Sequence, residues 1–93
     1  MKIIYSPRSQ STLQQIKAFI AKDSVSRANS FIKHLKKQIS AIKDMPFRYR
    51  KSDYFDDENV REMVYKGYTI IFFIDDETET ILILGIKKYK ENY

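Results

Sequence analysis

The chain has 93 residues, no cysteine, one histidine and a formal net charge of +5. This length supports a single domain, expected over residues 1–93, and the lack of Cys excludes disulfide scaffolds, thiolate metal sites and cysteine nucleophiles. With His34 as the only imidazole, histidine triads and multi-histidine metal sites are excluded too, so we expect no metal and no cofactor.

Hydropathy gives an expectation about location. The longest apolar run, Ile70–Ile74, is too short to cross a membrane. The N-terminus turns polar after four residues and lacks the apolar stretch of a signal peptide. We therefore expect a cytoplasmic protein without a membrane partner.

Charge is distributed unevenly along the chain. Residues 1–52 contain twelve Lys or Arg against two acids, giving +10, whereas residues 53–93 contain five against ten, giving −5. This asymmetry suggests a basic surface that meets phosphate or an acidic partner, although well-solvated helix faces would give the same pattern.

The first quarter of the chain predicts a strand followed by a helix. Residues 2–5 are rich in β-forming side chains, and Ser6-Pro7 combines a Ser N-cap with Pro at the first helical position. Apolar residues at helical spacing then predict a first helix over about residues 7–22. Asp23-Ser24 supplies a break and a new N-cap.

A second helix is predicted from Ser24 onward and is expected to end at Pro46. Its apolar seam, with a strict 4-3-4-3 spacing, is expected in the core. The seam consists of Ala28, Ile32, Leu35, Ile39 and Ile42. Lysines occupy the solvent side, where His34 is expected as a surface residue.

The second half of the chain predicts an antiparallel meander. Alternating, β-branched and aromatic stretches predict strands, separated by polar or glycine-containing turns. The expected strands are 60–65, 68–74 and 80–84, joined by Lys66-Gly67 and by residues 75–78. Residues 47–51 fit a strand or a loop, residues 53–58 predict an exposed acidic loop, and residues 86–93 form a basic, aromatic tail after Gly85.

The resulting order, β-α-α-β-β-β, predicts an α+β fold with two layers. An N-terminal strand and a helical hairpin would pack on a small, mostly antiparallel sheet. The other face of the sheet is left open for a partner.

Several short patterns occur in a characteristic order. They are Ser6-Pro7 followed by Leu13, Ile16 and Ile20; Ala28-x-x-Phe31; Val60-Arg61 with Tyr68 seven residues after the arginine; and Ile83-Leu84-Gly85-Ile86 with a basic tail ending in Tyr93. In this order and spacing the whole chain resembles the RelE/ParE superfamily of toxins from bacterial type II toxin–antitoxin pairs. The arginine-led hairpin resembles the gyrase-directed, ParE-like branch.

This resemblance implies a growth-inhibiting toxin, of the kind linked to plasmid stabilization, that a cognate antitoxin neutralises. The ParE-like branch inhibits DNA gyrase by binding, needs no catalytic residues, and is the interpretation we favour. The alternative is a ribosome-dependent mRNA endoribonuclease of the RelE type, whose partners are the ribosome and mRNA. In that branch an Arg usually follows the Tyr of the central strand and an Arg or His stands in the C-terminal segment, where this chain has Thr69 and Tyr89.

The candidate contact residues are mainly cations and aromatics, and no catalytic residue is assigned. The candidates for target binding are Arg61, Lys87, Lys88, Tyr89, Lys90 and Tyr93. The candidates for antitoxin binding are Lys33, Lys36 and Lys37, because antitoxins usually present acidic side chains and apolar anchors. A structural alternative stays open for each group: Arg61 would pair with a nearby carboxylate, and the lysines would simply be solvated.

Overall fold

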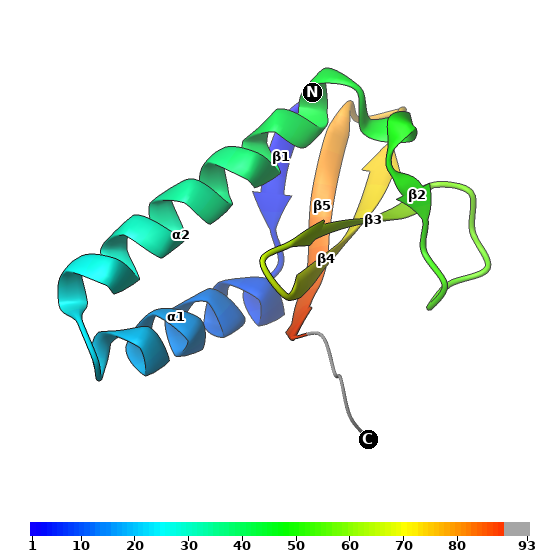
Figure 1. Cartoon of the computed structure of the whole chain (residues 1–93). Coiled ribbons are helices and arrows are strands. Elements are labelled where there is room, and N and C mark those ends of the chain that lie inside the picture. Colours follow the sequence, from blue (N-terminus) through cyan, green and yellow to red (C-terminus); the bar gives the residue numbers. More distant parts are fainter. Residues whose placement is uncertain (89–93) are drawn as a thin grey trace.

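A computed structural model describes residues 1–88 of the chain, which form two helices, two short 3-10 turns and five strands (Figure 1). The N-terminal elements are β1 (Lys2–Tyr5), α1 (Pro7–Ala21) and α2 (Val25–Ser40), followed by the 3-10 turns η1 (Ala41–Asp44) and η2 (Pro46–Arg48). The remaining strands are β2 (Arg50–Lys51), β3 (Val60–Tyr65), β4 (Tyr68–Asp75) and β5 (Thr80–Lys88). The expected order is confirmed, and the undecided residues 47–51 contain the end of η2 and the short strand β2.

The five strands form one sheet in the order β1-β5-β4-β3-β2. The pairs β2–β3, β3–β4 and β4–β5 are antiparallel, whereas β1 runs parallel to β5. The β3–β4 turn has Lys66 at φ 47° and Gly67 at φ 86°, the left-handed conformations of the tight hairpin turn predicted there. The α+β class with a mostly antiparallel sheet is therefore confirmed.

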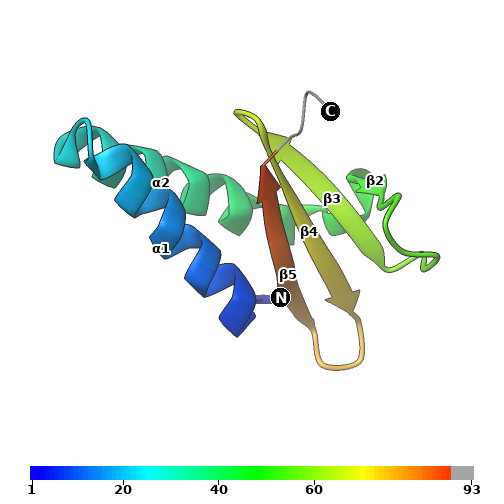
Figure 2. The ribbon, with the colours of Figure 1, turned by 90° about the horizontal axis from the view of Figure 1, so that it is seen from below.

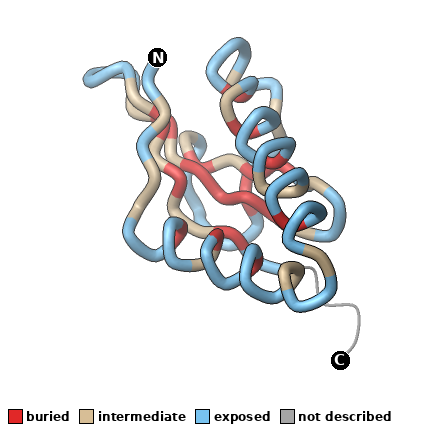
Figure 3. The backbone as a smooth tube through the Cα atoms, turned by 90° about the vertical axis from the view of Figure 1, so that its left-hand side faces the viewer, coloured by how far each residue is buried: buried red, intermediate tan, exposed pale blue. Residues whose placement is uncertain are grey.

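Both helices lie on the same face of the sheet and make the second layer (Figure 2). Buried positions gather where the helices meet the strands (Figure 3), and the α2 seam contributes Ala28, Leu35, Ile39 and Ile42, each 0% exposed. The sheet contributes Ile70, Phe72, Ile74, Ile81 and Ile83 to the same core. None of the helices in residues 1–88 combines the length and the apolar character needed to span a membrane.

Both helix starts follow the predicted capping pattern. The Ser6 hydroxyl accepts a hydrogen bond from the Ser9 amide at 3.1 Å and donates one to the Leu84 carbonyl at 3.1 Å. Ser24 caps α2 by accepting from the Arg27 amide. Ser6 thus satisfies a free amide of α1 and ties the start of that helix to β5.

Two sequence-based boundaries were wrong. The α-helical part of α2 ends at Ser40 rather than at Pro46, because the chain tightens into η1, which keeps Ile42 fully buried. The last strand continues to Lys88 rather than ending at Leu84, because β4 begins at Tyr68, whose partner is Lys88. A bulge at Leu84 places Ile71 opposite Gly85 while Phe72 lies opposite Ile83. Lys87 and Lys88 are therefore strand residues and not part of a tail.

Candidate functional site

A groove of about 440 Å³ lies where the sheet face opposite the core meets the start of α1. The residues that line it come from β4, β5, the loop after β2 and α1. They are Ile71, Leu84, Gly85, Ile86, Lys87, Tyr54, Phe55, Arg8 and Thr12. We call it the open-face groove. Aliphatic strand residues and two cations thus meet at the sheet face that we expected to be free for a partner.

Lys87 and Lys88 point to opposite sides of β5. The Lys87 ammonium lies 4.4 Å from the centroid of the Tyr54 ring, at the open-face groove, and Lys87 is the register partner of Thr69. The Lys88 ammonium lies 5.7 Å from the Phe19 ring centroid on α1. Only Lys87 of this pair lines the groove. Tyr89, Lys90 and Tyr93 lie outside the described residues.

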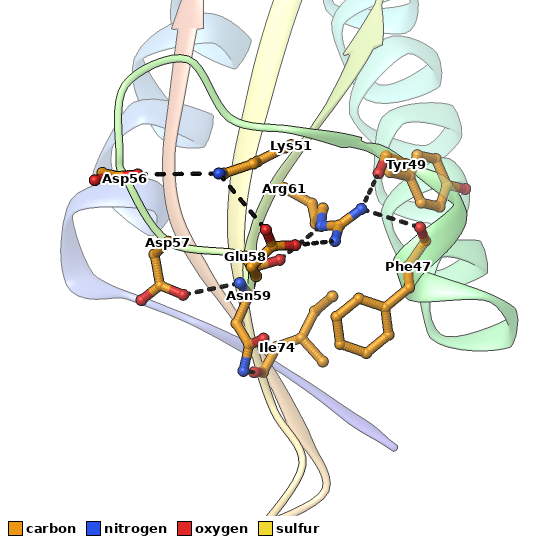
Figure 4. Close-up of polar contacts among 9 residues, drawn as sticks. All are labelled: Phe47, Tyr49, Lys51, Asp56, Asp57, Glu58, Asn59, Arg61 and Ile74. Atoms are coloured by element: carbon orange, nitrogen blue, oxygen red, sulfur yellow. Dashed lines mark hydrogen bonds and ion pairs between the residues drawn. The ribbon is translucent and has the colours of Figure 1, made fainter.

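Arg61 faces the helix side of the sheet, where it is the register partner of the buried Phe72. Its side chain is 16% exposed. Its guanidinium donates to the carbonyls of Phe47 at 3.1 Å and Tyr49 at 3.0 Å, and to the Glu58 carbonyl at 2.8 Å (Figure 4). The Glu58 carboxylate lies 3.6 Å away, and the Phe47 ring centroid lies 5.1 Å from the guanidinium carbon. Arg61 therefore holds the segment after α2 against β3 and does not line the open-face groove.

The acidic loop between β2 and β3 is held by side-chain contacts at both ends. Lys51 lies 3.9 Å from an Asp56 carboxylate oxygen and 3.8 Å from one of Glu58. The Asp57 carboxylate accepts from the Asn59 amide at 2.8 Å, and the Asn59 side chain donates to the Ile74 carbonyl at 3.0 Å (Figure 4). These contacts fix the loop that carries Tyr54 and Phe55.

Glu62 is an anchoring residue that sequence reasoning did not single out. Its side chain is 4% exposed, accepts hydrogen bonds from the Ser52 hydroxyl at 2.9 Å and the Asp53 amide at 3.3 Å, and lies 3.2 Å from Nε of Arg50. A carboxylate is retained in a buried position only when it is paired and hydrogen-bonded. The sequence feature that could have indicated this role is an acidic residue in the middle of the predicted strand Val60–Tyr65.

The three lysines proposed for antitoxin binding are all exposed on α2. They differ in position, since Lys36 lines a second groove, between the two helices and β1, which Lys33 and Lys37 do not line. Within residues 1–88, no group of three or more His, Cys, Asp or Glu side chains is arranged to hold a metal ion.

A family model described as "ParE toxin of type II toxin-antitoxin system, parDE" matches residues 3–93. The chain belongs to the ParE toxin family. No curated protein sequence matches it significantly.

Several solved toxin structures share the fold of this ParE-family chain. A structure titled as the chromosomal ParDE system from P. aeruginosa is similar with a TM-score of 0.78, at 13% identity over 97% of each chain. The isolated RelE toxin of E. coli has a TM-score of 0.69 at 13% identity, over 98% of this chain and 86% of that one. The E. coli RelBE toxin–antitoxin complex has a TM-score of 0.69 at 12% identity, over 97% and 98%. At these identities the likeness shows a shared fold.

In this ParE-family fold the open-face groove can hold an anionic group through Lys87 and Arg8. In the described part of the chain, carboxyl and imidazole groups able to transfer a proton are scarcer at this groove than cations. Glu62, the strand carboxylate whose register partner is the groove residue Ile71, is already engaged by Ser52, Asp53 and Arg50. Binding is thus the chemistry that these side chains support best.

Proposed function

We propose that this ParE-family toxin inhibits DNA gyrase by binding and that a cognate antitoxin neutralises it. The observation that carries the proposal is the match of the ParE family model to residues 3–93. The structures titled ParDE and RelBE contain toxin–antitoxin systems, which supports an antitoxin as the partner of this chain as well.

The composition of the open-face groove favours binding over RNA cleavage. Cleavage requires activation of a ribose hydroxyl and stabilisation of charge on phosphate. Thr69, which is 9% exposed, takes the position at which the cleaving branch usually has an arginine. Its register partner Lys87 offers a point charge without the planar, bidentate geometry of a guanidinium.

In the proposed mechanism the open-face groove meets an anionic surface of the gyrase–DNA intermediate and blocks resealing. Lys87 would contact phosphate or a carboxylate, and Lys88 would add charge at the neighbouring surface. Tyr89, Lys90 and Tyr93, which follow β5 in sequence, would add further contacts to the target. Arg61 would act as a positioning residue that holds the segment after α2 against β3, because its guanidinium donates to the carbonyls of Phe47, Tyr49 and Glu58.

The test is brief induction of the toxin without antitoxin, with plasmid supercoiling and translation measured in parallel. We expect early loss of supercoiling and an SOS response while translation continues. Immediate translation arrest with cleaved transcripts would instead support the ribosome-dependent endoribonuclease. A chain that leaves growth unaffected would contradict both mechanisms.

Gly85 gives a variant that fills the open-face groove. Apart from its two chain neighbours, a Cβ built on Gly85 meets no heavy atom within 4 Å, so the site is open to a side chain and we expect Gly85→Val to fold. We expect Gly85→Val and Lys87→Ala to weaken inhibition of purified gyrase by at least about tenfold, a loss of ~1.4 kcal/mol. Lys43→Ala removes the same charge from an exposed position in η1 and should leave inhibition within about twofold. Equal effects of Lys87→Ala and Lys43→Ala would remove the open-face groove from the target interface.

A further inference from the structure

An exposed phenylalanine near the end of α1 lies between two lysines. Phe19 is 64% exposed, although large aromatic side chains are usually buried. The Lys22 ammonium lies 6.0 Å from the centroid of its ring, and the Lys88 ammonium at the end of β5 lies 5.7 Å from it. Two cations from distant parts of the chain are thus placed at one solvent-exposed ring.

A groove of about 370 Å³ lies next to this ring, a volume within the range of about 300–1,000 Å³ typical of ligand sites. Ile20, the residue after Phe19, lines it together with Arg27 of α2 and with residues of the β3–β4 hairpin. Figure 2 shows the β3–β4 turn and the end of β5 at the same end of the sheet. We define the hairpin-end surface as Phe19, Lys22, Arg27, Tyr65, Lys66 and Lys88.

Aromatic contacts connect the groove with the end of β5. Phe31 of α2 lines the groove, and its ring centroid lies 6.0 Å from that of Tyr65 and 5.9 Å from that of Tyr68. Tyr68 is the register partner of Lys88. The Lys66 ammonium lies 5.8 Å from the Tyr65 ring centroid, so the groove repeats the pairing of a ring with a cation found at Phe19.

The hairpin-end surface carries four cations and little negative charge. Neither α1 nor α2 contains an Asp or Glu. Asp23, in the connection between the helices, pairs with Arg27 at 3.9 Å, and both side chains are exposed. The ion pairs within residues 1–88 do not include the lysines of this surface. An anionic ligand would therefore disrupt only one weak, exposed ion pair.

We propose that the hairpin-end surface binds single-stranded DNA. One base would stack on Phe19, and the phosphates beside it would contact Lys22 and Lys88. The strand would continue into the groove, where Lys66 and Arg27 offer further phosphate contacts. The choice of DNA rests on the proposed function, in which the toxin binds a gyrase–DNA intermediate, and the inference adds a contact between the toxin and the DNA itself.

The arrangement favours a single strand over a duplex and over a membrane. In a duplex the bases stack on one another, whereas an unpaired base has a free face for an exposed ring. A membrane-binding surface gathers apolar side chains on one face. Here charged side chains separate Phe19 from Val25, the next exposed large apolar residue of the chain. Duplex DNA and anionic vesicles are the competing ligands in the tests below.

Variants of Phe19 test the stacked base. The probe is a fluorescein-labelled oligothymidylate of about 12 nucleotides, within the usual range of about 4–16 for one binding module, and binding to the full chain is followed by anisotropy. We expect Phe19→Ala and Phe19→Leu to weaken binding by at least about fivefold, or ~1 kcal/mol, because both remove the aromatic face. Phe19→Trp should bind at least as tightly as the wild type. Val25→Ala truncates a side chain of matched exposure, 63%, and should stay within about twofold.

The salt dependence of the same binding tests the phosphate contacts. For single strands, log K falls with log[salt] by about 0.7 for each phosphate that is neutralised, so four cations predict a slope of about −3. Lys22→Ala and Lys66→Ala should each make the slope shallower by about 0.7. Lys43→Ala removes the same charge from η1, beyond the other end of α2, and should leave the slope unchanged. Equal changes for Lys43→Ala and Lys22→Ala would overturn the assignment to this surface.

A second measurement uses the absence of native tryptophan. Phe19→Trp places the only indole at the proposed stacking position, whereas Met45→Trp places it beyond the other end of α2, at a residue that is 58% exposed. We expect oligothymidylate to quench the first indole by at least about half and the second much less, because only the first stacks on a base. Equal quenching by duplex DNA would overturn the preference for a single strand. A blue shift with phosphatidylglycerol vesicles and no quenching by oligothymidylate would overturn the proposal in favour of a membrane.

The inference and the proposed function can fail separately, because these assays contain no gyrase. If the wild-type chain does not bind oligothymidylate, or if Phe19→Ala and Phe19→Leu bind it like the wild type, the inference falls while inhibition of purified gyrase still supports the proposed function. If oligothymidylate binds as expected and purified gyrase is not inhibited, the proposed function falls and the DNA contact stands. Tighter binding of oligouridylate than of oligothymidylate would overturn the choice of DNA.

Discussion

The ammonium group of Lys87 lies 4.4 Å from the centroid of the Tyr54 ring, so strand β5 meets the acidic loop at the open-face groove. A cation–π contact of this kind contributes about 0.5–1 kcal/mol at an exposed site. This energy is enough to favour one position of Lys87, but a phosphate or a carboxylate would outcompete the ring for the ammonium group. The loop thereby keeps the candidate target cation at the groove until a stronger anionic partner binds.

A double-mutant cycle measures this contact directly. We expect Tyr54→Ala and Lys87→Ala to show a coupling free energy of about 0.5–1 kcal/mol in urea unfolding. Tyr54→Phe should retain the coupling, since the ring and not the hydroxyl makes the contact. Phe55→Ala paired with Lys87→Ala is the control and should be additive. A zero coupling for Tyr54 would show that the ring does not hold the lysine.

Arg61 should be important for stability. Arg61→Ala removes three charge-assisted hydrogen bonds to backbone carbonyls, and we expect a loss of about 2–4 kcal/mol in the free energy of unfolding. Arg61→Lys should recover less than half of this, because one ammonium group cannot reproduce the planar arrangement of donors. Arg27→Ala, which breaks an exposed 3.9 Å ion pair, is the control and should cost less than about 0.5 kcal/mol. A stable Arg61→Lys protein that no longer inhibits growth would instead indicate a direct contact with the target.

Glu62 should control the order of the loop between β2 and β3. Glu62→Ala leaves the Ser52 hydroxyl and the Arg50 guanidinium without their shared acceptor, and we expect a destabilisation of about 2–3 kcal/mol. Limited trypsin digestion should then cut after Lys51 much faster than in the wild type. The exposed Glu58 gives the control: Glu58→Ala should cost about 0–1 kcal/mol and change the digestion little. Wild-type digestion kinetics for Glu62→Ala would contradict the anchoring role.

The two helix caps should differ in their effect on stability. Ser6→Ala removes both the cap of α1 and the hydrogen bond to Leu84 of β5, so we expect a loss of about 1.5–3 kcal/mol. Ser24→Ala removes only a local, exposed cap and should cost about 0.5–1 kcal/mol. Thermal and urea unfolding of the two variants measure the difference. Equal losses would mean that the contact between Ser6 and β5 adds nothing beyond capping.

Tyr5 should make the folded state sensitive to alkaline pH. Its pKa is raised in the folded protein by desolvation, so the unfolded state loses the phenolic proton first. Its contribution to stability is present below the unfolded pKa of about 10 and is lost as the pH rises through the higher folded value. Tyr5→Phe should therefore lose less stability than the wild type between about pH 9.5 and 11. Parallel stability–pH curves for the two proteins would contradict the shift.

Local sequence signals were sufficient for most elements. The Ser6-Pro7 and Ser24 caps fixed both helix starts, the Ala28–Ile42 seam identified the buried face of α2, and Lys66-Gly67 identified the hairpin turn. Each of these depends on neighbouring residues alone. The end of α2 was misplaced because the seam continues through a 3-10 turn, where Ile39 and Ile42 keep a spacing that fits either helix type.

The site was less predictable because its contacts join distant segments. The side of the sheet that Arg61 faces depends on the register with β4, and the role of Glu62 depends on the two-residue strand β2. The open-face groove likewise needs the bulge at Leu84, which places Gly85 opposite Ile71. Sequence composition identified the candidate cations but could not assign Lys87 and Lys88 to different sides of one strand.

The pairing of the first strand with the last has a consequence for biosynthesis. Among the strands of residues 1–88, β1 is an edge strand that pairs with β5, and the Ser6 hydroxyl donates to the Leu84 carbonyl 78 residues away. At roughly 5–20 residues per second, about 4–16 s separate the synthesis of these partners on the ribosome. The open-face groove has the same dependence, since Arg8 and Lys87 line it together. An interrupted nascent chain therefore lacks both the β1–β5 pairing and the complete lining of the open-face groove, so the proposed target contact can form only after nearly all of residues 1–88 have been made.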